Sequence, residues 1–264
     1  MMPWIMRGLR HGVVTSRYPR LGDGYGDGFA GGVTVRGDVA DAAVLDLCIA
    51  DCPTGAITVE ADGPLLDRGR CVHCGRCVDH APETFSYSPN FQTARSGREG
   101  LVVPTVGEDD ASLAVLRRRV AQTTAMFRRS VHIRHVDAGS DGSDEWEVAA
   151  LTNPVYDVQR LGIFFTASPR HADLLLVTGV ATVGMRDALL ATYEAMPAPK
   201  IVVAAGAEAI SGGLIGHTYA SLGGVDHVLP VDVYVPGAPP TPFGLLYGIL
   251  IAVSILAEPL GGTR

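Results

Sequence analysis

Apolar runs and amphipathic stretches alternate through the second half of the chain. Strand-like patterns occupy residues 131–136, 172–179, 200–206 and 225–237, and helix-like patterns occupy 156–165, which runs into extended chain, and 185–196. Strands that are buried on both faces read as short continuous apolar runs, and their alternation with helices is typical of a parallel sheet covered by helices. The pattern therefore predicts an α/β domain over residues 131–264.

The longest apolar run is FGLLYGILIAVSILA, Phe243 to Ala257. Its 15 residues fall short of the roughly 20 that span a bilayer. We predict a buried helix, with a helix that faces a partner as the alternative. The first fourteen residues include basic side chains but no long apolar core, so no signal peptide is expected.

The first part of the chain has a different pattern. Glycine-rich and cysteine-bearing segments with little periodicity predict a small, loop-rich unit that depends on bound metal. We expect an N-terminal arm at 1–38 and a cysteine-bearing module at 39–104. Residues 105–130 have helical periodicity, an acidic start and a basic end, which suits the helix dipole and predicts a connector helix.

Charge and cysteine content narrow the chemistry. A net charge of −7 argues against nucleic acid as a partner, because phosphate binding needs clustered lysine and arginine. All five cysteines lie between Cys48 and Cys77. An odd number in so short a stretch indicates a metal site in a reducing compartment rather than a disulfide framework.

The cysteine spacing resembles that of bacterial ferredoxins, whose repeated motif is C-x2-C-x2-C-x3-C-P. In that motif the fourth cysteine ligates the other of two clusters. The second copy here ends in Ala81-Pro82, whereas the first copy ends in Cys52-Pro53. Crossover therefore predicts one complete [4Fe–4S] site, formed by Cys52, Cys71, Cys74 and Cys77.

The same rule predicts that the second ferredoxin site is lost, because its positions are Ala42, Leu45, Cys48 and Ala81. Cys48 is then expected to be a small buried apolar residue. A four-cysteine zinc site is the alternative for the intact set. His73 and His80 lie nearby, either as further ligands or as solvated loop side chains.

A family resemblance covers nearly the whole chain. GLRHGVVTSRYP (8–19) and the cysteine region resemble the ferredoxin-like electron-transfer subunit of formate hydrogenlyase and related membrane-bound hydrogenases. Residues 153–182, 193–206 and 223–242 are similar to the small, quinone-proximal 20 kDa-type subunit of complex I-like assemblies. The resemblance implies a fusion of the two subunits. The implied fold is an α+β ferredoxin-like module of the degenerate two-cluster type, joined to a flavodoxin-like α/β parallel-sheet domain.

The resemblance also implies a terminal cluster on four cysteines of the small subunit. The matching positions here are Asp141, Asp144, Glu208 and Ala238, none of which offers sulfur, so this cluster is expected to be absent. The three carboxylates are expected to converge, and gathered carboxylates need a cation, a proton, water or a basic partner. The alternatives are a divalent-metal or proton-loading site, a hydrated pocket, or salt bridges to Arg134, Arg160 and Arg170.

The resemblance implies a peripheral-arm subunit on the cytoplasmic side of the membrane, in a complex I-like or membrane-bound-hydrogenase-like complex. Expected partners are a hydrogenase-large-subunit-like chain and antiporter-like membrane subunits. We expect mainly a structural adaptor; electron transfer through the single cluster and cation or proton coupling are alternatives. The chain has no complete active site of its own. No G-x-G-x-x-G follows VTGVAT (177–182), so NAD binding is not expected.

Overall fold

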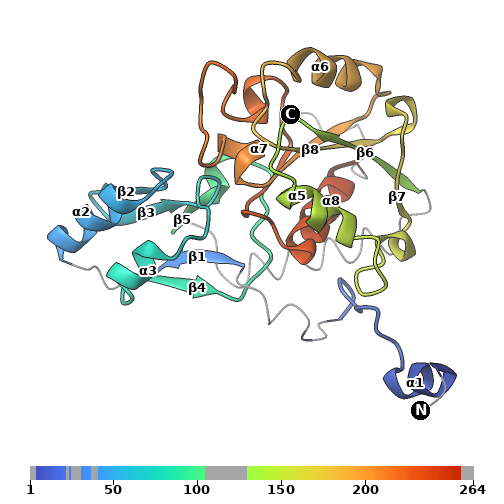
Figure 1. Cartoon of the computed structure of the whole chain (residues 1–264), viewed down its shortest axis with the longest axis horizontal. Helices are drawn as coiled ribbons and strands as arrows, with labels where there is room; N and C mark the ends of the chain where they lie inside the picture. Colours follow the sequence, from blue (N-terminus) through green and yellow to red (C-terminus); the bar gives the residue numbers. More distant parts are fainter. Residues whose placement is uncertain (1–3, 22–23, 25–30, 37–40, 105–129, 257–264) are drawn as a thin grey trace.

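The computed structural model describes residues 4–21, 24, 31–36, 41–104 and 130–256, which form two adjoining parts (Figure 1). Residues 32–103 form two small antiparallel sheets with two helices, and residues 131–256 form a parallel sheet with helices on both faces. Helix α1 (Trp4–His11) stands apart from both and buries no residue. The predicted connector helix at 105–130 lies outside the described residues, apart from Ser130.

The second part is a five-stranded sheet in the order β10-β9-β8-β6-β7, in which every neighbouring pair is parallel. The first strand of the sequence, β6, lies inside the sheet, with β7 on one side and the later strands on the other. This is the strand order of flavodoxin-like folds. The predicted α/β parallel sheet is therefore confirmed, and its strands are β6 (Val131–Asp137), β7 (Ile163–Phe165), β8 (Leu174–Thr178), β9 (Ile201–Ala205) and β10 (Val233–Val235).

Alternate residues of the central strands supply two separate cores, because successive side chains of a strand point to opposite faces. Leu174 and Leu176 belong to one apolar cluster, and Leu175 and Val177 belong to the other. Helices α5 (Ser143–Ala150) and α8 (Pro242–Leu256) pack against the first face. Helices α6 (Arg186–Ala195) and α7 (Ala207–Ser211) pack against the second. Three 3-10 turns complete this part: η3 (Val158–Leu161), η4 (Pro169–His171) and η5 (Val225–His227).

The C-terminal apolar run forms a buried helix, as predicted. In α8, Phe243, Tyr247 and Leu250 are almost fully buried against the sheet. The Phe243 ring also contacts the rings of Tyr18 and Phe91, so segments from the first part of the chain complete this core. No helix in the described residues is long and apolar enough to cross a membrane.

The first part contains more regular structure than its sequence pattern predicts. Strand β1 pairs with β4, and β2, β3 and β5 form a three-stranded sheet. The loop-rich prediction was wrong in extent because these strands are short and irregularly buried; in β2 only the first of four residues is buried. The elements are β1 (Gly32–Val35), α2 (Ala42–Asp51), β2 (Ile57–Glu60), β3 (Gly63–Asp67), α3 (Arg76–His80), β4 (Phe85–Ser88), η2 (Glu99–Leu101) and β5 (Val102–Val103).

Two local predictions for the second part need correction. The helix expected at 156–165 is only the 3-10 turn η3 followed by β7, because Asp157 and Gly162 both have left-handed backbone angles that bracket a single turn. Helix α5 was not predicted, since its glycine- and serine-rich approach, DAGSDG, has the composition of a loop.

Candidate functional site

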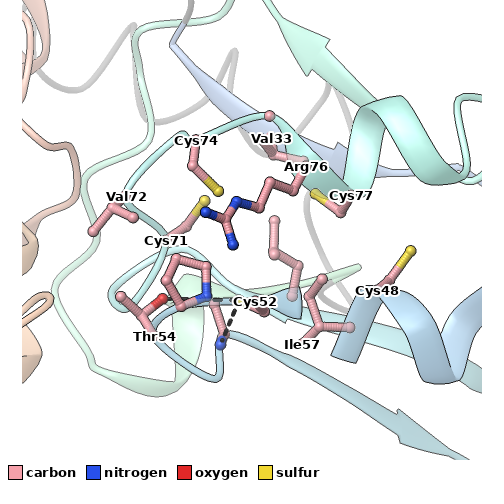
Figure 2. A pocket seen from close by; sticks show the side chains of 14 residues that line it. Val33, Cys48, Cys52, Thr54, Ile57, Cys71, Val72, Cys74, Arg76 and Cys77 are labelled. Carbon is pink, nitrogen blue, oxygen red and sulfur yellow. Dashed lines mark hydrogen bonds between the residues drawn. The ribbon is translucent and has the colours of Figure 1, made fainter. Parts of the chain in front are cut away.

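All five cysteines line one small cavity in the first part of the chain (Figure 2). Cys48 lies in α2 and Cys52 directly after it, whereas Cys71, Cys74 and Cys77 lie in the loop after β3 and in α3. Gly75 permits the turn into α3 because its φ is +82°, and a Cβ there would overlap the Tyr87 hydroxyl. The cavity has a volume of about 20 Å³. The fold therefore places the four predicted cluster ligands, together with Cys48, around one space.

The Cys71 and Cys77 sulfur atoms lie in buried surroundings that disfavour free thiolates. Burial raises the pKa of Cys71 to about 12 and that of Cys77 to about 11. The Cys52 sulfur accepts a hydrogen bond from the Ala56 N–H at 3.2 Å, a contact that suits a sulfur carrying negative charge. Thiols of this kind ionise when a metal replaces the proton. The donor set therefore fits a thiolate-bound metal cofactor.

The two nearby histidines have other surroundings. His80 Nε2 lies 2.9 Å from Asp51 Oδ2, and this hydrogen bond is the main reason that the pKa of Asp51 is lowered. Burial and then the nearby Arg68 charge lower the pKa of His73. In the part of the chain that the structure describes, no group of three His, Cys, Asp or Glu side chains is placed to hold a single metal ion.

The positions of the predicted lost ferredoxin site are filled by apolar packing. Leu45, Cys48 and Ala81 are at most 5% exposed and belong to the apolar cluster around Phe85. Ala42 is exposed at the start of α2. Three of the four positions therefore lie in one packed cluster. Packed side chains occupy the space that a second cofactor would need.

A second, larger pocket lies at the carboxyl ends of the parallel strands. Its lining includes Asp141, Asp144, Glu208 and Ala238, and its volume is about 380 Å³. The first two follow β6, Glu208 follows β9 and Ala238 follows β10. Because the carboxyl ends of parallel strands meet at one edge of a sheet, residues almost a hundred positions apart converge there. The three carboxylates that were expected to converge therefore line one pocket, together with Ala238.

Asp144 is the most deeply placed carboxylate in this pocket. It is 2% exposed, and its Oδ2 has no hydrogen-bond partner. Gly206 packs directly against the carboxylate, and a Cβ at that position would overlap Oδ2. Burial raises the pKa of Asp144 to about 8, and the negative charge of Glu208 is the next contribution. The carboxyl group is therefore largely protonated at neutral pH.

The other two carboxylates differ from Asp144 in exposure. Asp141 is exposed, and hydrogen bonds from Ser143 lower its pKa; the Ser143 N–H lies 2.9 Å from Asp141 Oδ1. Glu208 is half-buried, its pKa is raised by burial and then by Asp141, and its Oε2 has no hydrogen-bond partner. The surroundings of Asp144 and Glu208 thus disfavour the ionised carboxylate, whereas Asp141 is well solvated.

The alternative with arginine salt bridges is wrong for the described residues. None of the three carboxylates forms an ion pair there, and Arg134, Arg160 and Arg170 do not neutralise them. The arginine that lines the pocket is Arg76, which comes from the cysteine-bearing part and bonds to Asp51. Sequence reasoning missed Arg76, although its position inside the C-x2-C-x2-C motif was a signal.

The cysteine cavity and the carboxylate pocket share a wall. Pro53, Val72, Cys74 and Arg76 line both. In Figure 2, Arg76 extends its guanidinium group toward the cavity that Cys71 and Cys74 face. The two sites therefore adjoin, although they belong to different sheets.

Comparisons with known proteins find a family and relatives to which this chain is similar. Residues 142–252 match the family model described as NADH ubiquinone oxidoreductase, 20 Kd subunit. Formate hydrogenlyase subunit 7 of Escherichia coli (strain K12) is 40% identical over 162 residues, which cover 61% of this chain and 61% of that protein, less than two thirds of its length. The probable membrane-bound hydrogenase subunit mbhJ of Pyrococcus furiosus is 39% identical over 147 residues, covering 56% of this chain and 88% of that protein.

A solved structure of the membrane-bound sulfane sulfur reductase, an archaeal respiratory membrane complex, contains a chain that is 32% identical. The superposition has a TM-score of 0.45 and covers 53% of this chain and 77% of that one.

Proposed function

Because this chain belongs to the family of the 20 kDa subunit of NADH ubiquinone oxidoreductase, we propose that it is a peripheral subunit of a complex I-like or membrane-bound-hydrogenase-like complex. Its main role there is that of a structural adaptor. The supporting observation is that Asp141, Asp144, Glu208 and Ala238 line one pocket in an intact fold and contribute no sulfur. Thiolate is the ligand that iron–sulfur clusters require, so the terminal relay position is retained in shape and lost in chemistry.

The proposal assigns one [4Fe–4S] cluster to Cys52, Cys71, Cys74 and Cys77 of the first part. The element order β1-α2-β2-β3-α3-β4, with β1 paired to β4, supports a ferredoxin-like module. When bound, the cluster supplies one-electron transfer, and the thiolates that hold it cross-link α2, the loop after β3 and α3. This cross-linking is a reason to retain it in an adaptor, because a small unit with short strands gains stability from bound metal.

A zinc ion is the less favoured occupant. Tetrahedral zinc needs four ligands about 2.3 Å from one ion. Three cysteines at strict two-residue spacing, together with the remote Cys52-Pro53, favour the cluster, because this is the ferredoxin arrangement.

The expected partners are a hydrogenase-large-subunit-like chain and antiporter-like membrane subunits, with the chain on the cytoplasmic side of the membrane. Support comes from the relatives, which are named as subunits of formate hydrogenlyase and of a membrane-bound hydrogenase. The cysteine cavity lies directly beside the pocket at the sheet edge, which supports the proposal that one chain combines two subunits that are otherwise separate.

The test is purification of the tagged chain from membranes under anaerobic conditions, with partner identification and with iron and acid-labile sulfide assayed per chain. We expect membrane subunits to copurify and the iron and sulfide to equal one cluster. In the adaptor role, a variant that lacks the cluster but still folds retains the partners. Copurification of no membrane subunit would contradict the subunit assignment, and zinc in place of iron would contradict the cofactor.

Electron transfer is the second candidate function. The supporting observation is the wall shared by the two pockets, since Cys74 and Arg76 lie between the cysteine cavity and the former relay position. A redox partner at that wall would be close to the cluster. Rapid reoxidation of the dithionite-reduced complex by its substrate, followed by EPR, would favour this role over the adaptor. If no partner reoxidises the reduced cluster, the adaptor role remains as the proposed function.

A cation- or proton-coupling site formed by Asp141, Asp144 and Glu208 is the third candidate. The supporting observation is that Asp144 and Glu208 each have a carboxylate oxygen without a hydrogen-bond partner in a pocket that no arginine salt bridge neutralises within the described residues.

A further inference from the structure

The carboxylate pocket contains two acceptor atoms that lack donors. Asp144 Oδ2 and Glu208 Oε2 are buried and accept no hydrogen bond, and Asp144 is 2% exposed. A buried acceptor without a donor destabilises the fold, and more so when it is charged. Native structures rarely retain them without a ligand, water or proton to satisfy them. These two oxygens therefore lack donors from the described residues, and a cationic ligand that displaces the proton held by Asp144 would supply them.

The charge of the lining selects a cation. Three of its side chains are carboxylates, and the one basic side chain among them, Arg76, donates to the Asp51 carbonyl and carboxylate at 3.1 and 3.3 Å. An anion would be repelled by the ionised Asp141 and Glu208 carboxylates, because Arg76 already bonds to Asp51. A cation would gain charge-assisted hydrogen bonds, which are roughly twice as strong as neutral ones.

The size and lining of the pocket favour an organic cation over a metal ion. Its volume of about 380 Å³ leaves room for a ligand much larger than a single ion or water. In the described part of the chain, no three metal-binding side chains are placed around one ion. Carbon-rich side chains complete the lining and would contact methylene groups: Pro53, Val72, Leu214 and Ala238.

From these observations we propose that the pocket binds the ammonium or guanidinium group of an organic cation, which donates hydrogen bonds to Asp144 and Glu208 while its aliphatic stem packs against the apolar lining. The inference deepens the third candidate function by naming the ligand class. It rests on that proposed pocket and not on membership in a membrane complex. Ala238 contributes the space, because a small side chain stands where the family resemblance implies a cluster ligand.

The test uses the full chain and agmatine, which has an ammonium and a guanidinium group on one short stem, with Mn²⁺ as the metal probe. Titration calorimetry should show one agmatine site, weakened at least about tenfold in both Asp144→Asn and Glu208→Gln. Glu147→Gln is the matched control, because Glu147 lies on the same helix as Asp144 but outside the pocket. The Glu147→Gln variant should bind agmatine with the same affinity as the unmodified chain.

A further variant keeps the inference testable if the charge variants misfold. Ala238→Leu fills the pocket at an exposed position without changing any charge and should also abolish agmatine binding. Equal agmatine affinity in all variants, absence of any agmatine site, or Mn²⁺ binding at these carboxylates in its place would overturn the inference. Since the measurement is made on the isolated chain, such a failure leaves the subunit assignment intact.

The source of the cation is resolved by repeating the titration on the assembled complex. Agmatine binding that persists there identifies a free small molecule as the ligand. Binding that is present in the isolated chain and lost in the complex identifies a lysine or arginine side chain of a partner subunit. A carbodiimide cross-link from Glu208 or Asp144 to a partner lysine would then identify that residue.

Discussion

Arg95 and Tyr234 exchange a pair of backbone hydrogen bonds, from the Arg95 N–H to the Tyr234 carbonyl at 3.0 Å and from the Tyr234 N–H to the Arg95 carbonyl at 2.8 Å. Tyr234 lies in β10, the edge strand of the parallel sheet, and Arg95 belongs to the first part of the chain. The contact caps an edge that would otherwise offer unpaired backbone groups to other chains. It also joins the part that carries the cysteines to the part that carries the carboxylate pocket.

This relationship predicts slow amide exchange at both residues. In hydrogen–deuterium exchange, the protection factors of the Arg95 and Tyr234 amides should lie within about tenfold of that of the Val203 amide in β9. Both hydrogen bonds break only when the two parts of the chain separate. Gly97, in the following loop, is the internal reference and should exchange faster. Fast exchange at Arg95 together with slow exchange at Val203 would mean that the edge of β10 opens independently.

Gly179→Ala should destabilise the fold strongly. Gly179 has φ of +80°, and a Cβ there would lie 2.6 Å from the Gly139 carbonyl carbon and 2.7 Å from the Ser140 nitrogen. Backbone cannot move aside as a flexible side chain can, so we expect a loss of about 2–4 kcal/mol in urea unfolding. Gly184→Ala is the control, because a Cβ there meets nothing within 4 Å, and it should stay within about 0.5 kcal/mol. Similar losses at both positions would contradict the close approach.

Asp144→Asn should change how stability depends on pH. The folded pKa of about 8 exceeds the ordinary value of 3.8, so between these values the folded state holds a proton that the unfolded state has released. Stability from this group is therefore lost as pH rises from about 4 to 8, by at most about 1.4 kcal/mol per pH unit. The variant should match the unmodified chain near pH 4 and exceed its Tm by roughly 5 °C or more at pH 9.

The control for this comparison is Asp187→Asn, at an exposed position in the first turn of α6. At pH 9 the Tm difference between Asp187→Asn and the unmodified chain should be much smaller than that of Asp144→Asn, because Asp187 is exposed. A constant Tm difference for Asp144→Asn across the range would indicate that Asp144 is ionised throughout and that its burial is compensated.

Agmatine binding should release a proton. The cation needs an ionised Asp144, so affinity should rise by up to roughly tenfold per pH unit toward pH 8 and then level. The charged groups that influence this titration are Glu208, Glu145, Asp141 and Asp137. Cys74 and Arg76 line the facing wall of the same pocket. Calorimetry in buffers of different ionisation enthalpy measures the released proton directly. Affinity that is flat or falls between pH 6 and 8 would contradict the linkage.

Cys52→Ala and Cys48→Ala should differ sharply in iron content. Both side chains line the same cavity and lie four residues apart, but only Cys52 is assigned to the cluster, and its sulfur alone accepts the Ala56 N–H. Cys52→Ala should lose the iron, the acid-labile sulfide and the EPR signal of the reduced chain. Cys48→Ala should retain them, with at most a modest packing loss from its apolar cluster. The reverse result would reassign the fourth ligand.

The sequence by itself determined the elements that depend on local pattern. The apolar runs predicted β8, β9 and the buried helix α8, and the 20 kDa-type resemblance agrees with the family to which the chain belongs. Short-range pattern is informative there because each run is buried along its whole length. The same reasoning overlooked α5 and the short strands of the first part, whose burial depends on neighbours distant in sequence.

Only the tertiary structure decided how the candidate sites meet. The sequence indicated that Asp141, Asp144 and Glu208 stand at ligand positions of the family. Their exposure differs because only Asp144 lies beneath Gly206, inside the edge where β6 and β9 end. It gave no indication that Arg76 and Cys74 form the opposite wall. Pocket depth, missing hydrogen-bond partners and a raised pKa are properties of groups gathered from separate strands, and they exist only once the sheet has brought those strands together.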